Sequence, residues 1–307
     1  MEPTVSVIIP AHNSSSTLPD TLDSLCAQTF QNFEAIVIDD GSTDNTGIIA
    51  RSYGQKVRCI RQTNLGVASA RNSGISNSTG TLLAFLDSDD LWHRDKLEHQ
   101  VALLSERPDL DATYCGVVVV DNELNELRRI PANEYKDLCR SLLLYSSVIP
   151  SSPSTLMVRR RCAESVGGYD TRFSQCADWD FLIRLSQVAK LSPIEEYLVR
   201  YRRGPNVMSN DVSLLERDTF AVLDAFFSRP ESEPYRQLVN EIYSNHWMIL
   251  CGSYFVQRQL AESIRCSIKG LRLDPTNVVR ILGLPLRRLN RRMHKQRRIL
   301  LQPYARE

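Results

Sequence analysis

Residues 82–90 read Leu-Leu-Ala-Phe-Leu-Asp-Ser-Asp-Asp, an apolar run that ends in three carboxylates within four positions. An apolar run without polar alternation predicts a strand that is buried on both faces. Residues 5–9 and 35–38 form two earlier runs of the same kind, and candidate helices at 44–53 and 66–77 separate the three runs. This alternation of strand and helix predicts an α/β fold with a mostly parallel sheet and helices on both of its faces.

Polar or turn-forming residues follow each of the three predicted strands: Pro10, Ala11 and His12 after the first, Asp40 after the second, and Asp87 and Asp89 after the third. Ligands of open parallel sheets bind beyond the carboxyl ends of the strands, so we expect these residues at one edge. Two carboxylates at this spacing can bind one Mg²⁺ or Mn²⁺ together with substrate phosphates. The alternative for the same carboxylates is a favourable position at a helix N-terminus.

Two further charged positions lie in predicted helices. Residues 65–74 are mostly small and carry one guanidinium, Arg71, which could pair with a diphosphate or with the acidic loops. Small residues also allow a helix to pack closely against a sheet. Asp178 and Asp180 flank Trp179 at the start of a helix predicted over 181–191, where helix capping is the simpler interpretation.

The composition is that of an ordinary globular protein. The 307 residues are 42% hydrophobic and 24% charged, which excludes collagen-like, disordered and disulfide-scaffold classes. The eight cysteines are scattered and show no metal-binding spacing, so we expect reduced cytoplasmic thiols. No G-x-G-x-x-G follows the first predicted strand, which argues against dinucleotide-binding and P-loop enzymes. We expect neither a signal peptide nor a membrane span.

Charge is distributed unevenly along the chain. Residues 251–307 hold 13 Lys and Arg against 3 Asp and Glu, which leaves 24 against 33 for residues 1–250. The pattern is wholly helical from about residue 210, with segments near 213–227, 234–256, 260–272 and 276–299. Within 286–301, apolar residues fall on one helical stripe among cations, which is typical of helices that lie on anionic lipid. Without interleaved aromatic residues, nucleic acid is a poor candidate partner.

Five segments occur in one order along the chain. They are Val-Ser-Val-Ile-Ile-Pro-Ala-His-Asn at 5–13, Ile-Asp-Asp-Gly-Ser-Thr-Asp at 38–44, Ala-Arg-Asn-Ser-Gly at 70–74, Phe-Leu-Asp-Ser-Asp-Asp at 85–90 and Ala-Asp-Trp-Asp at 177–180. Together they resemble family 2 glycosyltransferases of the GT-A fold. The resemblance spans roughly residues 4–210, and the five segments in this order and spacing are specific.

The resemblance implies a GT-A, nucleotide-diphospho-sugar transferase domain over 1–210, with a donor half at about 1–115 and an acceptor half at about 116–210. A helical extension follows over 211–307. It further implies a UDP-, GDP- or dTDP-sugar donor and a Mg²⁺ or Mn²⁺ ion. The family's site residues correspond here to Pro10, Ala11, His12, Asp40, Arg71 and Asp87 for the donor, Asp89 and Asp87 for the metal, and Asp178 for the catalytic base.

The resemblance therefore predicts inverting transfer of one sugar to an acceptor hydroxyl. The acceptor would be a glycan or a polyprenyl-linked molecule in cell-surface polysaccharide, O-antigen or exopolysaccharide assembly. We expect a cytoplasmic protein, with peripheral contact to an anionic membrane through 286–301.

Two departures from the family pattern keep an alternative open. The Glu of the usual Glu-Asp pair is replaced by Ala177, and no His follows Tyr201, where Arg202 or Arg203 could supply the charge. The alternative is a catalytically silent protein of the same fold that binds a nucleotide-sugar or acts as a scaffold.

Overall fold

A computed structural model describes residues 2–145, 153–203 and 211–278, and these residues fall into two compact units. Unit 1 contains the residues up to Lys136 together with 153–203, and unit 2 contains 137–145 together with 211–278. The predicted membrane-binding segment 286–301 and most of the predicted helix at 276–299 lie outside the described residues. The grouping of 137–145 with the helical unit was not anticipated from the sequence.

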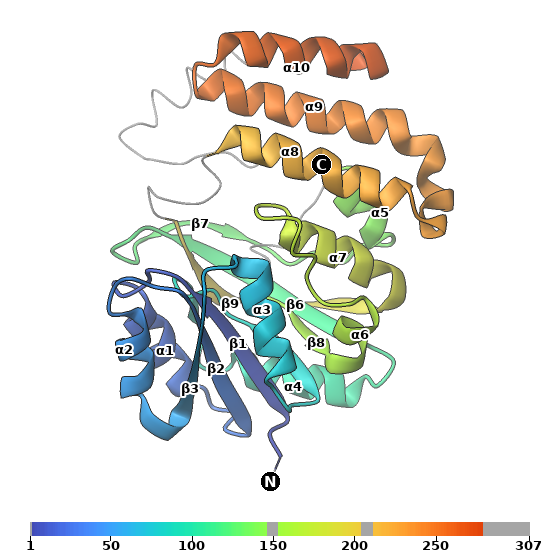
Figure 1. The fold of residues 1–307 in the computed structure, drawn as a ribbon. Coiled ribbons are helices and arrows are strands. Elements are labelled where there is room, and N and C mark those ends of the chain that lie inside the picture. Colours follow the sequence, from blue (N-terminus) through green and yellow to red (C-terminus); the bar gives the residue numbers. More distant parts are fainter. Residues whose placement is uncertain (1, 146–152, 204–210, 279–307) are drawn as a thin grey trace. The chain divides into compact units, whose positions relative to one another are not determined.

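Unit 1 is built on one mixed sheet, which in the described residues has nine strands. Along the path β3-β2-β1-β4-β8-β6-β9-β5, the first four strands are parallel to one another, and β7 pairs with β6. The bounds are β1 Val5–Ala11, β2 Phe33–Asp40, β3 Val57–Gln62, β4 Leu82–Phe85, β5 Leu91–Trp92, β6 Ala112–Val120, β7 Glu126–Ile130, β8 Met157–Arg159 and β9 Leu191–Arg202. The predicted α/β class with a mostly parallel sheet is confirmed (Figure 1).

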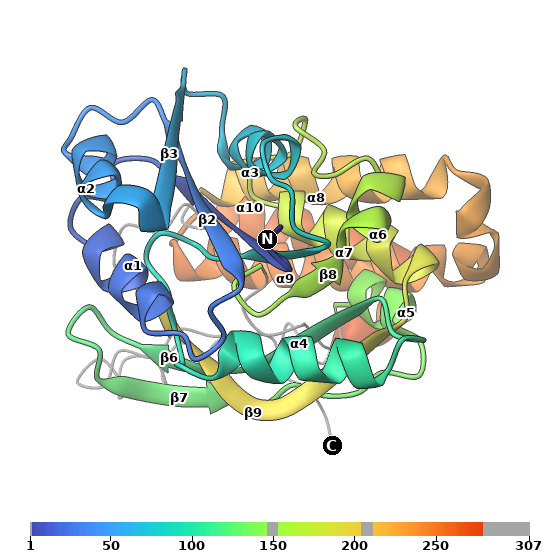
Figure 2. The same ribbon diagram turned by 90° about the horizontal axis from the view of Figure 1, so that it is seen from below.

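Helices cover both faces of this sheet (Figure 2). They are α1 Leu18–Cys26, α2 Thr46–Ser52, α3 Val67–Ser76, α4 Lys96–Glu106, α6 Arg160–Ser165 and α7 Ala177–Val188. Leu22 of α1 and Leu97 of α4 share the main core with Val7 of β1. Ala70 of α3 packs on the opposite face, against Ile36 and Ile38 of β2. The three predicted central strands are therefore buried on both faces, as their uninterrupted apolar runs require.

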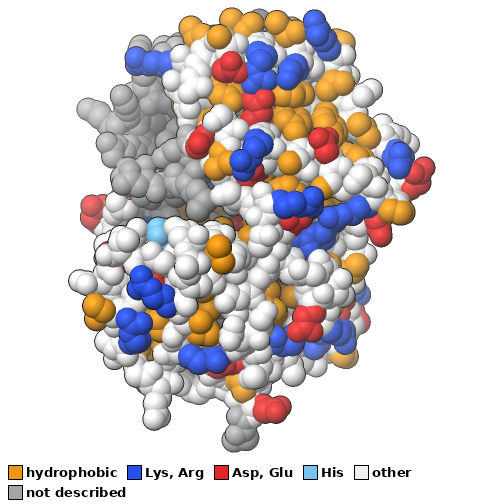
Figure 3. Space-filling model, viewed as in Figure 1, with side chains coloured by type: hydrophobic (Ala, Val, Ile, Leu, Met, Phe, Trp, Pro, Cys, Tyr) orange, Lys and Arg blue, Asp and Glu red, His pale blue; other side chains and the backbone are white. Residues whose placement is uncertain are grey.

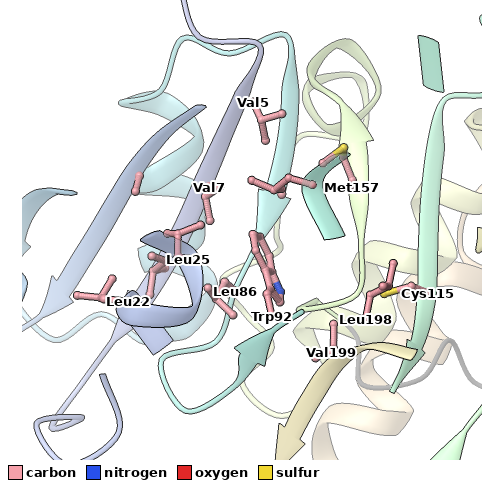
Figure 4. Close-up of a cluster of buried hydrophobic side chains, with 14 of the residues drawn as sticks. Val5, Val7, Leu22, Leu25, Leu86, Trp92, Cys115, Met157, Leu198 and Val199 are labelled. Atoms are coloured by element: carbon pink, nitrogen blue, oxygen red, sulfur yellow. The ribbon is translucent and has the colours of Figure 1, made fainter. Parts of the chain in front are cut away.

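Two close contacts explain particular residue choices. A Cβ atom added at Gly74 would overlap the side chain of Ile8, so α3 lies against β1 at a distance that only glycine permits. Trp92 is almost fully buried in the main core, and Figure 4 shows its ring among Leu86, Met157 and Val199. The indole of Trp92 thus fills the space between the parallel strands and the later, mixed part of the sheet.

Unit 2 is helical. It contains α5 Leu138–Leu143, α8 Val212–Phe227, α9 Val239–Val256 and α10 Leu260–Leu273, with 3₁₀ turns at Pro230–Leu238 and Pro275–Asn277. Its core includes Leu250 and Tyr254 of α9 and Cys266 of α10. α5 joins α9 through a hydrogen bond of 2.9 Å between His246 Nε2 and the Leu143 carbonyl oxygen. No helix in the described ranges is both long and apolar enough to cross a bilayer.

Candidate functional site

The predicted site residues gather at one edge of the parallel strands. Ala11 pairs with Asp39, and Ile8 pairs with Phe85, so β1, β2 and β4 end at the same edge. Asp40 is the last residue of β2, and the loops after β1 and β4 carry His12 and the acidic segment 87–90. This edge is the place where open α/β sheets bind their ligands.

Asp40 holds the loop that leads into α3. Its carboxylate accepts hydrogen bonds of 2.9 Å from the backbone N–H groups of Leu65 and Gly66 and one of 2.7 Å from Gln62 Nε2. Its backbone carbonyl accepts a bond of 2.8 Å from His12 Nδ1. Nδ1 of His12 therefore carries the ring hydrogen, and Nε2 is the acceptor. The direct contact of Asp40 with a donor stays a prediction, since both of its carboxylate oxygens are already used within the protein.

A residue that the sequence analysis did not single out joins the first two loops. Asn13 has a positive φ of 50°. Its N–H donates to Ser42 Oγ at 3.0 Å, and its side-chain oxygen accepts from the N–H of Thr43 at 2.8 Å. Asparagine tolerates this left-handed conformation better than most residues do. The segment after Pro10 and Ala11 is thus fixed against the loop after β2.

Arg71 brings two of the predicted acids together. It lies in α3 with 2% of its side chain exposed, and its guanidinium donates to Asp87 Oδ1 at 2.8 Å and to Asp178 Oδ1 at 2.6 Å. Burial alone would lower the pKa of Arg71, but the charges of Asp178 and Asp87 outweigh it and raise that pKa. The Tyr169 ring lies against the guanidinium, with 5.1 Å between its centroid and Arg71 Cζ. One buried cation therefore links the end of β4 to the start of α7.

Asp178 lies in the first turn of α7, which begins at Ala177, four residues before the predicted start of that helix. Burial raises the pKa of its carboxyl to about 6; the charge of Asp87 adds to this shift and the charge of Arg71 opposes it. The side chain remains 31% exposed, so it can be reached from solvent. A carboxylate with a pKa just below neutral pH is both ionised and basic enough to accept a proton.

The acidic segment after β4 concentrates negative charge. Burial and the neighbouring charge of Asp87 raise the pKa of Asp89 to about 6. Asp90 is fully buried, and burial together with the charges of Asp89 and Asp87 raises its pKa well above the usual range. Three carboxylates that repel one another would be stabilised by a cation, and their hard oxygens are the ligands that Mg²⁺ and Mn²⁺ prefer. The residues present therefore fit the predicted metal.

A complete metal site would need oxygen ligands in addition to these carboxylates. In the ranges that the structure describes, no group of three or more His, Cys, Asp or Glu side chains is arranged to hold a metal ion by itself. Two carboxylates completed by substrate phosphates are the usual arrangement for Mg²⁺.

Arg202 supports the acidic loop from β9. Its backbone N–H donates to Asp90 Oδ1 at 3.0 Å, and its guanidinium donates to the carbonyl oxygens of Asp89 and Asn122 and to Asp20 Oδ2. These bonds occupy the side chain within the protein. The structure therefore places Arg202 as a structural support for the loop, which leaves Arg203 as the remaining candidate to replace the missing His.

Ser154 is a second residue that the sequence analysis missed. It is fully buried, its hydroxyl accepts from the N–H of Asp87 at 3.1 Å, and its carbonyl oxygen accepts from Trp92 Nε1 at 2.8 Å. Ser154 thus ties the acidic loop to the core tryptophan. Ser154 lies 67 residues from Asp87 in the sequence, so no local sequence pattern indicates this contact.

A family model described as Glycosyl transferase family 2 matches residues 6–166. Two proteins from Rickettsia prowazekii and Rickettsia typhi, both described as uncharacterized glycosyltransferases, are 32% identical over 206 residues. These matches cover 65% of this chain but 64%, less than two thirds, of each relative. A PGL/p-HBAD biosynthesis glycosyltransferase of Mycobacterium tuberculosis is 33% identical over 192 residues, 59% of this chain and 69% of the relative.

Similar solved structures include Staphylococcus aureus TarS 1–349. The TM-score is 0.67 at 19% identity, over 94% of this chain and 88% of TarS 1–349. TarS 1–349 in complex with UDP-GlcNAc gives a TM-score of 0.68 at 18% identity, over 94% and 89% of the two chains. At these identities the similarity shows a common fold.

Proposed function

This chain belongs to glycosyl transferase family 2, and from that premise we propose that it transfers one sugar from a nucleotide-diphospho-sugar to an acceptor hydroxyl with inversion. The observation that carries the proposal is the pair of bonds by which Arg71 holds Asp87 and Asp178. Asp87, of the predicted donor and metal site, and Asp178, the predicted base, therefore both lie within reach of one guanidinium. Transfer needs both groups beside the same anomeric carbon.

Asp178 acts as the general base in this proposal. The acceptor oxygen attacks the anomeric carbon while its proton passes to Asp178, and the bond from that carbon to the diphosphate oxygen breaks on the opposite face. A single displacement inverts the anomeric centre and needs no carboxylate nucleophile. Arg71 orients Asp178 and, because it opposes the rise in the pKa of that carboxyl, keeps it ionised near neutral pH.

The leaving diphosphate needs positive charge. Asp89, with Asp87, would hold a Mg²⁺ or Mn²⁺ ion, and the bound cation would neutralise the charge that grows on the diphosphate. The nucleoside would lie along Pro10, Ala11 and His12, on the loops that Asn13 and Asp40 hold in place. A UDP-sugar is the first donor to test, because TarS, a protein of the same fold, forms a complex with UDP-GlcNAc.

The proposed process is assembly of a cell-surface glycan, with a glycan or polyprenyl-linked acceptor at the cytoplasmic face of the membrane. The relative described as a PGL/p-HBAD biosynthesis glycosyltransferase supports a product of the cell envelope. The basic, amphipathic sequence of 286–301 supports a position at an anionic lipid surface.

Calorimetric titration tests the donor site. UDP, GDP and dTDP are each titrated with Mn²⁺ and with EDTA, on the wild type and on the Asp89→Ala variant. The matched control is Glu106→Ala, an exposed acid of α4. We expect one nucleotide to bind only with metal, Asp89→Ala to bind at least about tenfold more weakly, and the control to bind normally. If no nucleotide shows metal-dependent binding, the protein is not this enzyme.

A catalytically silent protein is the second candidate, because Ala177 occupies the place of the family's Glu. Ala177 is almost fully buried in the first turn of α7. Asp178→Asn separates the two candidates. In the enzyme it lowers release of nucleoside diphosphate by about 10²- to 10⁴-fold and leaves donor binding unchanged. A silent protein binds the donor but shows no release in the wild type either.

A further inference from the structure

The last described helix, α10, carries a row of exposed apolar side chains. Leu260 is 52% exposed, Ile264 59% and Ile268 46%. Residues four apart lie on one side of a helix, so the three form a continuous row, which we call the α10 stripe. Val256, four residues earlier at the end of α9, is 38% exposed. Single exposed apolar residues are common on protein surfaces, but a row of this kind needs an explanation.

The stripe faces away from the core of unit 2. Ser263, Cys266 and Gly270 form the buried side of α10, and a Cβ atom added at Gly270 would overlap Met248 of α9. Cys266 belongs to the core cluster of the unit. Among the described residues of unit 2, the packing of α10 is therefore complete without the stripe.

Basic side chains border the stripe. Lys269 follows Ile268 by one position, and Arg272 continues the stripe by one more turn; both are exposed. Arg265 follows Ile264, but its guanidinium is ion-paired with Glu216 and Glu262. Figure 3 shows hydrophobic side chains interspersed with Lys, Arg and some Asp and Glu over the upper part of the surface. An apolar face with a basic border is the pattern of helices that lie in the interface of an anionic bilayer.

The sequence after α10 adds charge of the same sign. Residues 279–307 contain nine Lys and Arg and one acid, Glu307. A cation close to an anionic membrane surface adds to binding, whereas cations brought close to one another repel. Charge complementarity thus favours an anionic partner over an occupant that carries the same basic sequence.

We propose that the α10 stripe is a docking surface for an anionic phospholipid membrane. The side chains of Leu260, Ile264 and Ile268 enter the interfacial layer, and Lys269 and Arg272 contact the lipid phosphates. The proposal deepens the proposed membrane-linked function by naming the residues of unit 2 that bind the lipid. It does not depend on catalysis, because it concerns a separate surface.

A second copy of the chain is a weaker occupant. The stripe spans nine residues of helix, about 13 Å, whereas a stable protein interface buries about 800 Å² on each partner. Two copies packed stripe to stripe would also bring their basic borders together.

Vesicle sedimentation tests the proposal with the full chain. The vesicles are phosphatidylcholine alone or phosphatidylcholine with about one quarter phosphatidylglycerol. The variant is Ile264→Ser with Ile268→Ser, and the matched control is Ile48→Ser, which removes an isoleucine of α2 that is 63% exposed. We expect the wild type and the control to bind the anionic vesicles, and the double variant to bind them at least about tenfold more weakly.

Equal binding by the double variant and the wild type would overturn the proposal, and so would absence of wild-type binding to anionic vesicles. Light scattering adds another decisive result, because a wild-type dimer that becomes monomeric in the variant would assign the stripe to a second copy. Thermal melting and nucleotide titration of the variant show that unit 1 is intact. A failure to bind lipid is thereby distinguished from a failure of the proposed enzyme.

Discussion

Arg71 connects two parts of the chain that are 107 residues apart. The sequence indicated that its guanidinium would meet a diphosphate or acidic loops, and the structure places it between Asp87 and Asp178. Removing one partner of a buried ionic network leaves charges unpaired, at a cost of about 3–5 kcal/mol. Arg71 therefore contributes both to the stability of the site and to the ionisation of Asp178.

The Arg71→Met variant should shift the pH dependence of transfer. In the wild type, kcat/KM should fall as pH falls through about 6, because protonated Asp178 cannot accept a proton. The Arg71 charge lowers the pKa of Asp178, so its removal raises that pKa and moves the acid limb to higher pH. Nucleoside diphosphate release measured across pH checks this shift.

The Arg71→Lys variant keeps the positive charge, so the acid limb of its pH profile should shift less than that of Arg71→Met. Arg172→Met, which removes an exposed arginine paired with Asp170, should not move it. An acid limb that is identical in wild type and Arg71→Met would disprove the assignment of Asp178 as the titrating base.

Lys96 should make the stability of the protein depend on pH. It is fully buried, its Nζ donates to Gln100 at 2.7 Å and lies 3.9 Å from the Trp92 ring centroid, and burial lowers its pKa to about 8. The unfolded chain thus binds more protons between about pH 8 and 10.5, so the free energy of unfolding of the wild type should rise through this range. Relative to Lys96→Met, the gain should approach about 3 kcal/mol.

Denaturant unfolding of both proteins at several pH values measures this difference. Lys56→Met is the exposed control and should alter stability by less than about 0.5 kcal/mol. A wild type and a Lys96→Met variant whose stabilities differ by the same amount at pH 7 and pH 10.5 would contradict the prediction.

Motifs in the sequence allowed some residues of the candidate site to be singled out in advance. Asp87, Asp89 and Asp178 were singled out as carboxylates at the ends of strands or helices, and the structure places Asp87 and Asp178 on one arginine. Asn13 and Ser154 were missed because their contacts depend on loops that meet only after folding.

At the scale of elements, the close approach of α3 to β1 was predictable. The small residues of 65–74 indicated tight packing of a helix on a sheet, and Gly74 against Ile8 confirms it. The early strands were also predictable, since each is a short apolar run. α7 was harder, because its acidic first turn was interpreted as a cap that precedes the helix, whereas the helix begins at Ala177.

Gly74→Ala should destabilise unit 1 by about 1–3 kcal/mol, because the added methyl group overlaps Ile8 and forces α3 away from β1. Ser76→Ala, at an exposed position of the same helix, is the control. It should be neutral or slightly stabilising, since alanine has the higher helix propensity. Thermal and urea unfolding compare the two variants. Equal stability of Gly74→Ala and wild type would show that the Ile8 side chain can move to accommodate the added methyl group.

In the whole molecule, two separate segments of the chain belong to unit 2. Residues 137–145 join it first, and the chain then returns to unit 1 for β8, α6, α7 and β9 before α8 begins. The sequence predicted a division at residue 210, from the onset of wholly helical segments. It could not place α5 in unit 2, because the partner of α5 lies about 100 residues further along.

A chain truncated to residues 1–210 should therefore be poorly soluble. Cys139, Leu142 and Leu143 of α5 are buried, and α9, which holds α5 through His246, would be missing. Exposed apolar clusters of this kind promote aggregation. Size-exclusion chromatography should show aggregates for 1–210 and a single species for 1–278. A monodisperse 1–210 chain that binds nucleotide would show that α5 does not need α9.

Because α5 precedes its partner α9 by about 100 residues, α5 is synthesised well before the helix that it packs against. Leu143 leaves the ribosome 103 residues before His246, its hydrogen-bond partner. At synthesis rates of about 5–20 residues per second, α5 waits roughly 5–20 s for α9 while unit 1 completes its last strand. During that interval the apolar residues of α5 are exposed on the nascent chain, and exposed apolar segments are what chaperones bind. Slow codons before α9 would lengthen this exposure, so the yield of folded protein should respond to the translation rate of the helical unit.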